Sequence, residues 1–141
     1  MKGIASSLPA EWRSGLTGLI LAGAAGPFAW CAQGLINPAL SSYACYPGSV
    51  PREAPLPGFS WIAAESSVVV LAALLALAGA VFCWFAWRAT RDENPRAPKH
   101  LLEVGEGLAP VLAICGMLIN AGFLLAVMFE GSAVWAVPLC S

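Results

Sequence analysis

The sequence predicts an all-α integral membrane protein with three transmembrane helices, and two observations carry this prediction. Of its 141 residues, 59% are hydrophobic and 11% are charged, whereas soluble domains carry about 25% charged residues. Three apolar stretches, residues 15–36, 62–87 and 107–129, are each long enough to cross a hydrocarbon layer about 30 Å thick. We expect helices because a chain in lipid must satisfy its backbone polar groups internally, and no stretch alternates as a barrel strand does.

Each segment has features that justify it in turn. We expect the first to remain as a membrane helix, because the bulky Trp30 stands where lipoprotein processing before Cys31 needs a small residue. Pro27 is expected to kink this helix beside Gly26, and Pro110 to kink the third. The second segment is rich in Ala and Leu. Residues 1–141 therefore form a single domain, with an ordered Pro-rich loop over residues 37–61 outside the membrane.

Charge predicts the orientation of the three helices. The loop after the second segment is rich in basic residues, whereas Arg52 is the one basic residue of the 37–61 loop. By the positive-inside rule the N-terminus is cytoplasmic, together with Lys2 and Arg13, and the C-terminus is periplasmic in a bacterial inner membrane. The basic residues of the inner loop are Arg88, Arg91, Arg96 and Lys99. Aromatic residues mark both interfaces, namely Trp84, Phe85 and Trp87 inside, and Tyr43, Tyr46, Trp61 and Trp135 outside.

Two of the five cysteines are expected to pair. Cys45 and Cys140 both fall on the side assigned to the oxidising periplasm, one after the first helix and one after the third, so we predict a Cys45–Cys140 disulfide. The alternative is a pair of thiols that face solvent or a partner. The other three, Cys31, Cys83 and Cys115, lie within the apolar segments and are interpreted as small packing residues.

The sequence offers little chemistry of its own. The single histidine, His100, lies in the inner loop, and there is no covalent haem motif, metal-ligand spacing, phosphate loop or nucleophile elbow. We therefore expect no enzyme activity and no bound cofactor in this chain alone. A net charge of -1 argues against nucleic acid as a partner.

Three polar residues lie within the apolar segments, where such groups are costly. Gln33, Glu65 and Asn120 are placed toward the outer side by the orientation, so all three could meet at a similar depth. One interpretation is a proton or quinone contact. The other, which we favour, is hydrogen bonding between helices, worth about 0.6 kcal/mol per contact on average.

Small residues recur four apart along each segment and so share one helix face. Such stripes let another backbone approach closely, and three helices need few of them, which indicates packing against other membrane subunits. The stripes are Gly18, Ala22 and Gly26, then Ala72, Ala76 and Ala80, and finally Gly105, Ala109 and Ala113.

The stretch "GPFAWCAQGLINPALSSYAC" resembles a family of small membrane proteins encoded among the genes of haem-copper cytochrome c oxidases in proteobacteria. The matching residues are Pro27, Ala29, Trp30, Tyr43 and Cys45, with Pro138 and Cys140 near the end. Members often have a histidine three residues after the tryptophan, where this chain has Gln33, so no ligand role is carried over to that position. The resemblance implies the three-helix layout and an oxidase partner that holds the haem and copper.

Three functions are open at this point. The leading hypothesis is a non-catalytic accessory subunit of a respiratory membrane complex, a terminal oxidase above all, which stabilises the catalytic subunit and caps its periplasmic face. Its partners would be other integral membrane subunits, lipids and a periplasmic electron donor. The first alternative is an assembly factor that handles thiols or copper through Cys45 and Cys140. The second is a small oligomeric transporter or channel lined by Gln33, Glu65 and Asn120.

Overall fold

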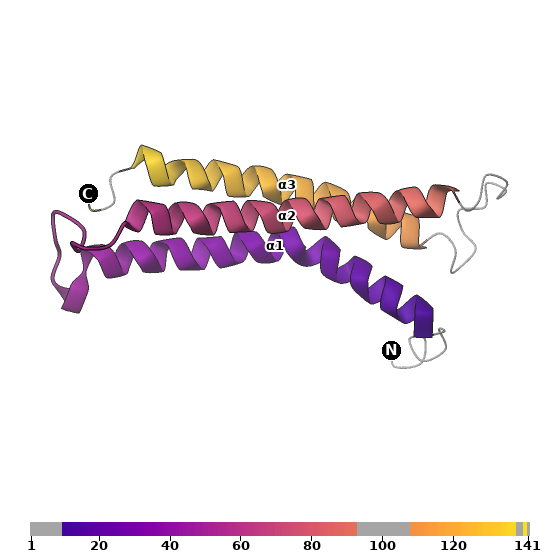
Figure 1. Ribbon diagram of the computed structural model, residues 1–141, viewed down its shortest axis with the longest axis horizontal. Helices are drawn as coiled ribbons and strands as arrows, with labels where there is room; N and C mark the ends of the chain where they lie inside the picture. Colours follow the sequence, from indigo (N-terminus) through magenta and orange to yellow (C-terminus); the bar gives the residue numbers. More distant parts are fainter. Residues whose placement is uncertain (1–9, 93–107, 138–139, 141) are drawn as a thin grey trace.

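The computed structural model describes residues 10–92, 108–137 and 140 of the chain. Three long helices make up most of this part: α1 (Ala10–Cys45), α2 (Trp61–Asp92) and α3 (Leu108–Ala136). They alternate in direction, so the end of α1, the start of α2 and the end of α3 lie together, at what we call the Cys45 end (Figure 1). All three are long and apolar enough to span a membrane, which confirms the predicted three-helix class.

The first helix is longer than the sequence predicts. α1 continues through Pro38 to Cys45, so the expected loop 37–61 is wrong over its first nine positions, residues 37–45. A fall in hydropathy does not require a helix to stop, because the backbone hydrogen bonds of a helix form in water as well as in lipid. The connection that remains contains a single 3₁₀ turn, η1 (Pro47–Ser49).

Backbone hydrogen bonds hold this short connection against the end of α1. The amide of Arg52 donates to the carbonyl of Cys45 at 2.9 Å, and that of Leu56 donates to the carbonyl of Ala44 at 3.2 Å. The indole of Trp61 in turn donates to the carbonyl of Leu56 at 2.9 Å. The loop is therefore folded back onto the helix ends.

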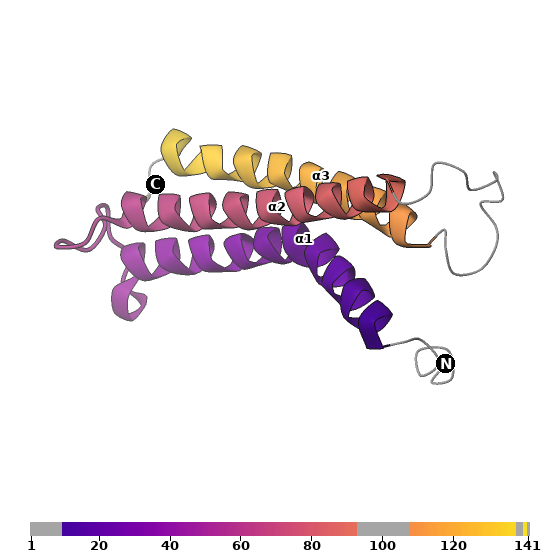
Figure 2. The same ribbon diagram turned by 45° about the vertical axis from the view of Figure 1, so that its right-hand side comes forward.

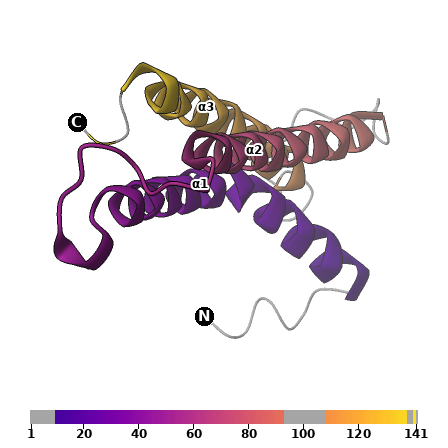
Figure 3. The same cartoon turned by 60° about the vertical axis from the view of Figure 1, so that its left-hand side comes forward.

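α1 changes direction near its middle, and its N-terminal half diverges from α2 and α3 in all three views (Figures 1, 2 and 3). Pro27 lies at the midpoint of the helix. A proline has no amide hydrogen to donate and its ring displaces the preceding turn, so it is the expected cause of such a bend. Pro110 differs, because it lies in the first turn of α3 as the structure describes it, from Leu108, where a proline breaks no helical hydrogen bond. The kink at Pro110 stays a prediction, since residues 93–107 are not described.

The bundle is thin, and its core consists of two small clusters on either side of the bend. One joins Ala29, Val69, Ala72 and Val127, and the other joins Leu19, Cys83 and Ala113. Within the most apolar window of each span, 22%, 28% and 22% of the residues are buried by the chain itself. Most of the apolar surface therefore faces outward, as lipid or partner helices require. Several predictions fall outside the described residues, those on Lys2, Arg96, Lys99, His100, Gly105 and Pro138.

Candidate functional site

Asn120 on α3 repairs the break that Pro27 makes in α1. Pro27 cannot donate to the carbonyl of Gly23, four residues earlier, and its ring disturbs the turn that contains Gly26 and Ala22. The Asn120 amide serves these groups: Oδ1 accepts from the Gly26 amide at 2.7 Å, and Nδ2 lies 3.0 Å from the Ala22 carbonyl oxygen and 3.3 Å from that of Gly23. Asn120 is fully buried. Its side-chain amide therefore supplies the hydrogen-bond partners that these backbone groups of α1 would otherwise lack.

Glycines allow the three helices to cross at this point. A Cβ on Gly79 of α2 would lie 2.6 Å from both the Ala22 carbonyl oxygen and Asn120 Oδ1. On Gly116 of α3 a Cβ would lie 2.8 Å from the sulfur of Cys83, and on Gly26 it would lie 2.9 Å from Asn120 Oδ1. Since real Cβ atoms do not approach other atoms this closely, these positions require glycine.

The second buried polar residue, Gln33, links α1 to α3 closer to the Cys45 end. Its side chain is 2% exposed, and Nε2 donates to the carbonyl of Val127 at 3.3 Å. Its Oε1 has no hydrogen-bond partner, and neither does Oδ1 of Asn37, one turn further along α1. An unpaired buried acceptor is costly, so a hydrogen-bond donor that reached either oxygen would stabilise this region.

The third, Glu65, links α2 to α1. It is 3% exposed, and its Oε1 accepts a hydrogen bond from the hydroxyl of Ser41 at 2.6 Å. The three links attach to α1 at Gly26, Gln33 and Ser41, so the first and last are 15 residues apart, about 22 Å at about 1.5 Å per residue. The expectation that Gln33, Glu65 and Asn120 meet at one depth is therefore wrong for Asn120.

Gln33 and Glu65 do share a pocket of about 690 Å³ between the helices near the Cys45 end. Asn37 and Ser41 line it from α1, and Glu130 lines it from α3 together with apolar side chains that include Phe129 and Val137. No basic residue is among the described residues that line it. The wall of the pocket therefore combines two acidic residues and apolar side chains with Gln33 and Asn37, whose unpaired oxygens are buried.

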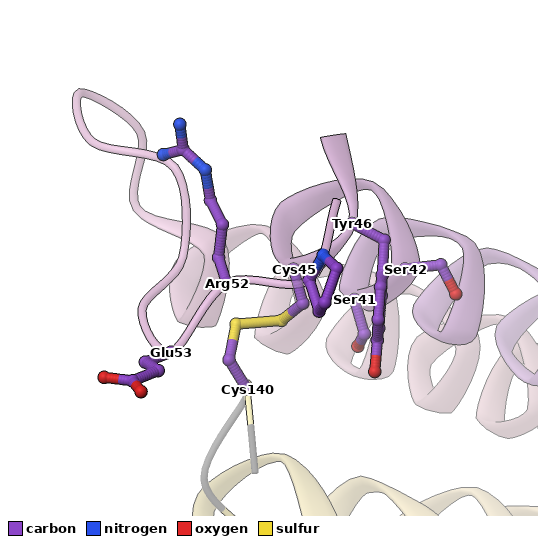
Figure 4. A pocket seen from close by; sticks show the side chains of 8 residues that line it. Ser41, Ser42, Cys45, Tyr46, Arg52, Glu53 and Cys140 are labelled. Carbon is purple, nitrogen blue, oxygen red and sulfur yellow. A yellow bond between two sulfur atoms is a disulfide. The ribbon is translucent and has the colours of Figure 1, made fainter. Parts of the chain in front are cut away.

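The structure joins Cys45 to Cys140, the pair that the sequence predicts, across 95 residues of chain. Figure 4 shows this disulfide beside Arg52 and Glu53, where a second pocket of about 480 Å³ opens on the folded-back loop. Arg52 and Glu53 extend away from the sulfur atoms (Figure 4). The disulfide connects the end of α1 to the chain beyond α3. Its Cys45 half is covered, since Cys45 is 4% exposed.

The predicted small-residue stripes pack inside the bundle and so are not surplus. Ala72 and Ala76 are buried, as are Gly26 and Ala113. Gly18, Ala22, Ala80 and Ala109 are half-buried. The described stripe residues let α1, α2 and α3 approach one another, so they are used within the bundle, and their packing against partner subunits stays a prediction. Gly79 and Gly116 lie closer to the neighbouring helices than the described glycines of the stripes do. The sequence does not predict their role, since a four-residue spacing pattern does not show which helices cross.

Among the described residues, no group of three or more His, Cys, Asp or Glu is arranged to hold a metal ion. The cysteines other than the disulfide pair are separate, with Cys83 buried and Cys31 and Cys115 exposed on the bundle surface. Comparison with known proteins found no match, whether with protein-family models, curated proteins or solved structures.

Proposed function

We propose that the protein is a non-catalytic accessory subunit of a bacterial inner-membrane respiratory complex, and that its partner subunits hold any haem or copper. The observation that carries the proposal is the contrast between the two ends of the bundle. At the Cys45 end the helices are joined by a disulfide and by the Ser41–Glu65 contact. Toward the Ala10 end, α1 diverges from its neighbours (Figure 3). In that half, α1 exposes large apolar side chains such as Ile20 and Leu21, which a helix of a larger membrane subunit can cover.

The outward face of α1 supplies the contact surface in this proposal. Thr17, Ala24 and Cys31 recur every seventh residue, and all three are exposed. Large apolar side chains flank them, with Leu21 and Phe28 each 68% exposed. Small residues let the backbone of another helix approach, and its side chains can then pack into the grooves between the large residues of α1. This arrangement is common where membrane helices associate.

A terminal oxidase is the complex that we propose, as the resemblance noted for residues 26–45 implies. In this arrangement the N-terminus is cytoplasmic and the folded-back loop faces the periplasm, where exposed Arg52 and Glu53 are available to a soluble electron donor. The positive-inside rule supports that orientation.

Purification from native membranes tests the proposal. A tagged chain in mild detergent should bring down haem-bearing subunits in a fixed, near-equal ratio, seen as haem absorbance and by quantitative mass spectrometry. Ala24→Trp, which fills the contact surface, should reduce that recovery, whereas Ala78→Trp, at an exposed position on α2, should not. Recovery of the chain alone would overturn the proposal. Substoichiometric recovery would favour the assembly factor, which also needs Cys45 and Cys140 as free thiols.

A further inference from the structure

We infer that the pocket between Gln33, Glu65 and Glu130 binds the primary ammonium group of an aminophospholipid such as phosphatidylethanolamine. This inference concerns a ligand of the chain itself and does not depend on the respiratory complex. It rests on the unpaired acceptors of the pocket, its charge, and its depth in the membrane.

The acceptors are buried and incompletely used. Gln33 Oε1 and Asn37 Oδ1 have no partner, and the carboxylate of Glu65 is paired at Oε1 with a single hydroxyl. A primary ammonium offers three hydrogens, so it can donate to more than one acceptor. Hydrogen bonds between an ammonium and a carboxylate or amide oxygen are also stronger than neutral ones.

The charge of the pocket selects the kind of headgroup. Glu65 and Glu130 contribute two carboxylates, and the described lining residues include no lysine, arginine or histidine. Anionic lipids are bound by clusters of basic residues, so their headgroups do not fit here. A choline headgroup carries a positive charge but has no hydrogen to donate. A primary amine satisfies both conditions.

The pocket lies near one end of the bundle, where spanning helices meet the lipid headgroups. Glu65 is four residues from the start of α2 and Glu130 is six from the end of α3, which places them about 6 and 9 Å from those helix ends. Tyr43 and Trp61 pack together at the same end, with ring centroids 6.0 Å apart, as interfacial aromatics do. Phe129 is 81% exposed and Val137 is 58% exposed, so an apolar surface for the acyl chains continues from the pocket wall.

The test uses the full chain, stripped of lipid and offered an equal mixture of phosphatidylethanolamine, phosphatidylcholine and phosphatidylglycerol with the same acyl chains. Native mass spectrometry should show phosphatidylethanolamine bound at least about fivefold more than either competitor, because only its ammonium can donate charge-assisted hydrogen bonds to the pocket. The paired variant Glu65→Gln with Glu130→Gln, which keeps both side-chain sizes, should remove that preference. Glu53→Gln, the same change at an exposed carboxylate outside the pocket, should keep it.

A second measurement guards against a variant that fails to fold. In lipid discs, phosphatidylethanolamine should raise the unfolding temperature of the parent chain above its value in phosphatidylcholine, and Gln33→Leu should abolish the difference. Non-reducing mass mapping of the Cys45–Cys140 bond verifies that each variant has folded. Equal binding of the ethanolamine and choline lipids, a preference for phosphatidylglycerol, or full selectivity in the paired variant would each overturn the inference.

Discussion

Asn120 on α3 accepts a hydrogen bond from the Gly26 amide on α1 at 2.7 Å, across 94 positions of sequence. The contact occurs at the residue before Pro27, where the α1 backbone loses its regular bonding. The side-chain amide nitrogen of Asn120 donates to the carbonyls of Ala22 and Gly23 on α1 and to the carbonyl of Gly116 on its own helix. The bend in α1 and the attachment of α3 therefore depend on each other. The backbone groups of α1 at the bend bond to the Asn120 side chain, and that buried side chain finds its partners there.

We predict that Asn120→Leu lowers the free energy of unfolding by about 2 kcal/mol, because it leaves the Gly26 amide and the Gly23 carbonyl buried without partners. In a Pro27→Ala background α1 can complete its own hydrogen bonds, so the same substitution should cost less than about 1 kcal/mol. Reversible unfolding in detergent measures this double-mutant cycle. Equal costs in the two backgrounds would show that Asn120 does not serve the proline break.

Gly79→Ala should also destabilise the bundle, by about 1–3 kcal/mol, as overpacking usually does. Its Cβ would lie 2.6 Å from a backbone oxygen of α1, and a backbone atom cannot move aside cheaply. Gly122→Ala is the matched control on α3, because no atom lies within 4 Å of its Cβ position. That variant should match or exceed the parent chain, through better helix propensity. If both variants have the same free energy of unfolding, the close approach of α1 and α2 at Gly79 does not require a glycine there.

The sequence predicts the class of this fold well because a membrane span depends on length and hydropathy, which are local properties. It also predicts the Cys45–Cys140 pair, since topology brings both residues to one side. It fails at the end of α1, where Pro38 and a fall in hydropathy suggest a loop but the helix continues. The Asn120 node and the role of Gly79 could not be predicted, because both depend on which helices cross and at what height.

Removal of the disulfide should loosen the folded-back loop more than the helices. The double variant Cys45→Ser with Cys140→Ser should lower the free energy of unfolding by about 1–2 kcal/mol, less than loop-closure entropy suggests, because the bilayer already restrains the helices. Hydrogen exchange at the amides of Arg52 and Leu56, which bond to the end of α1, should accelerate. Cys115→Ser, at an exposed cysteine outside the pair, is the control. Free thiols at both positions in protein purified without reductant would contradict the pairing.

Substitutions at the Ser41–Glu65 contact can distinguish a structural role of the Glu65 carboxylate from a role that needs its charge. The Ser41 hydroxyl has one proton, which it can donate either to Glu65 Oε1 at 2.6 Å or to the Asn37 carbonyl at 3.1 Å. Glu65→Gln keeps an acceptor oxygen of the same size, so it should change the free energy of unfolding by less than about 0.5 kcal/mol. Glu65→Leu removes the acceptor and should cost about 1 kcal/mol.

Ser41→Ala removes the donor of this contact and should cost a similar amount to Glu65→Leu, while the two substitutions together should cost little more than either alone. Unfolding of the four chains in one detergent gives the coupling energy directly. Additive costs would show that the hydrogen bond contributes nothing to stability. The same Glu65→Gln chain in sealed vesicles tests the channel hypothesis, because a path that needs the charge must lose its flux in a variant that remains fully folded.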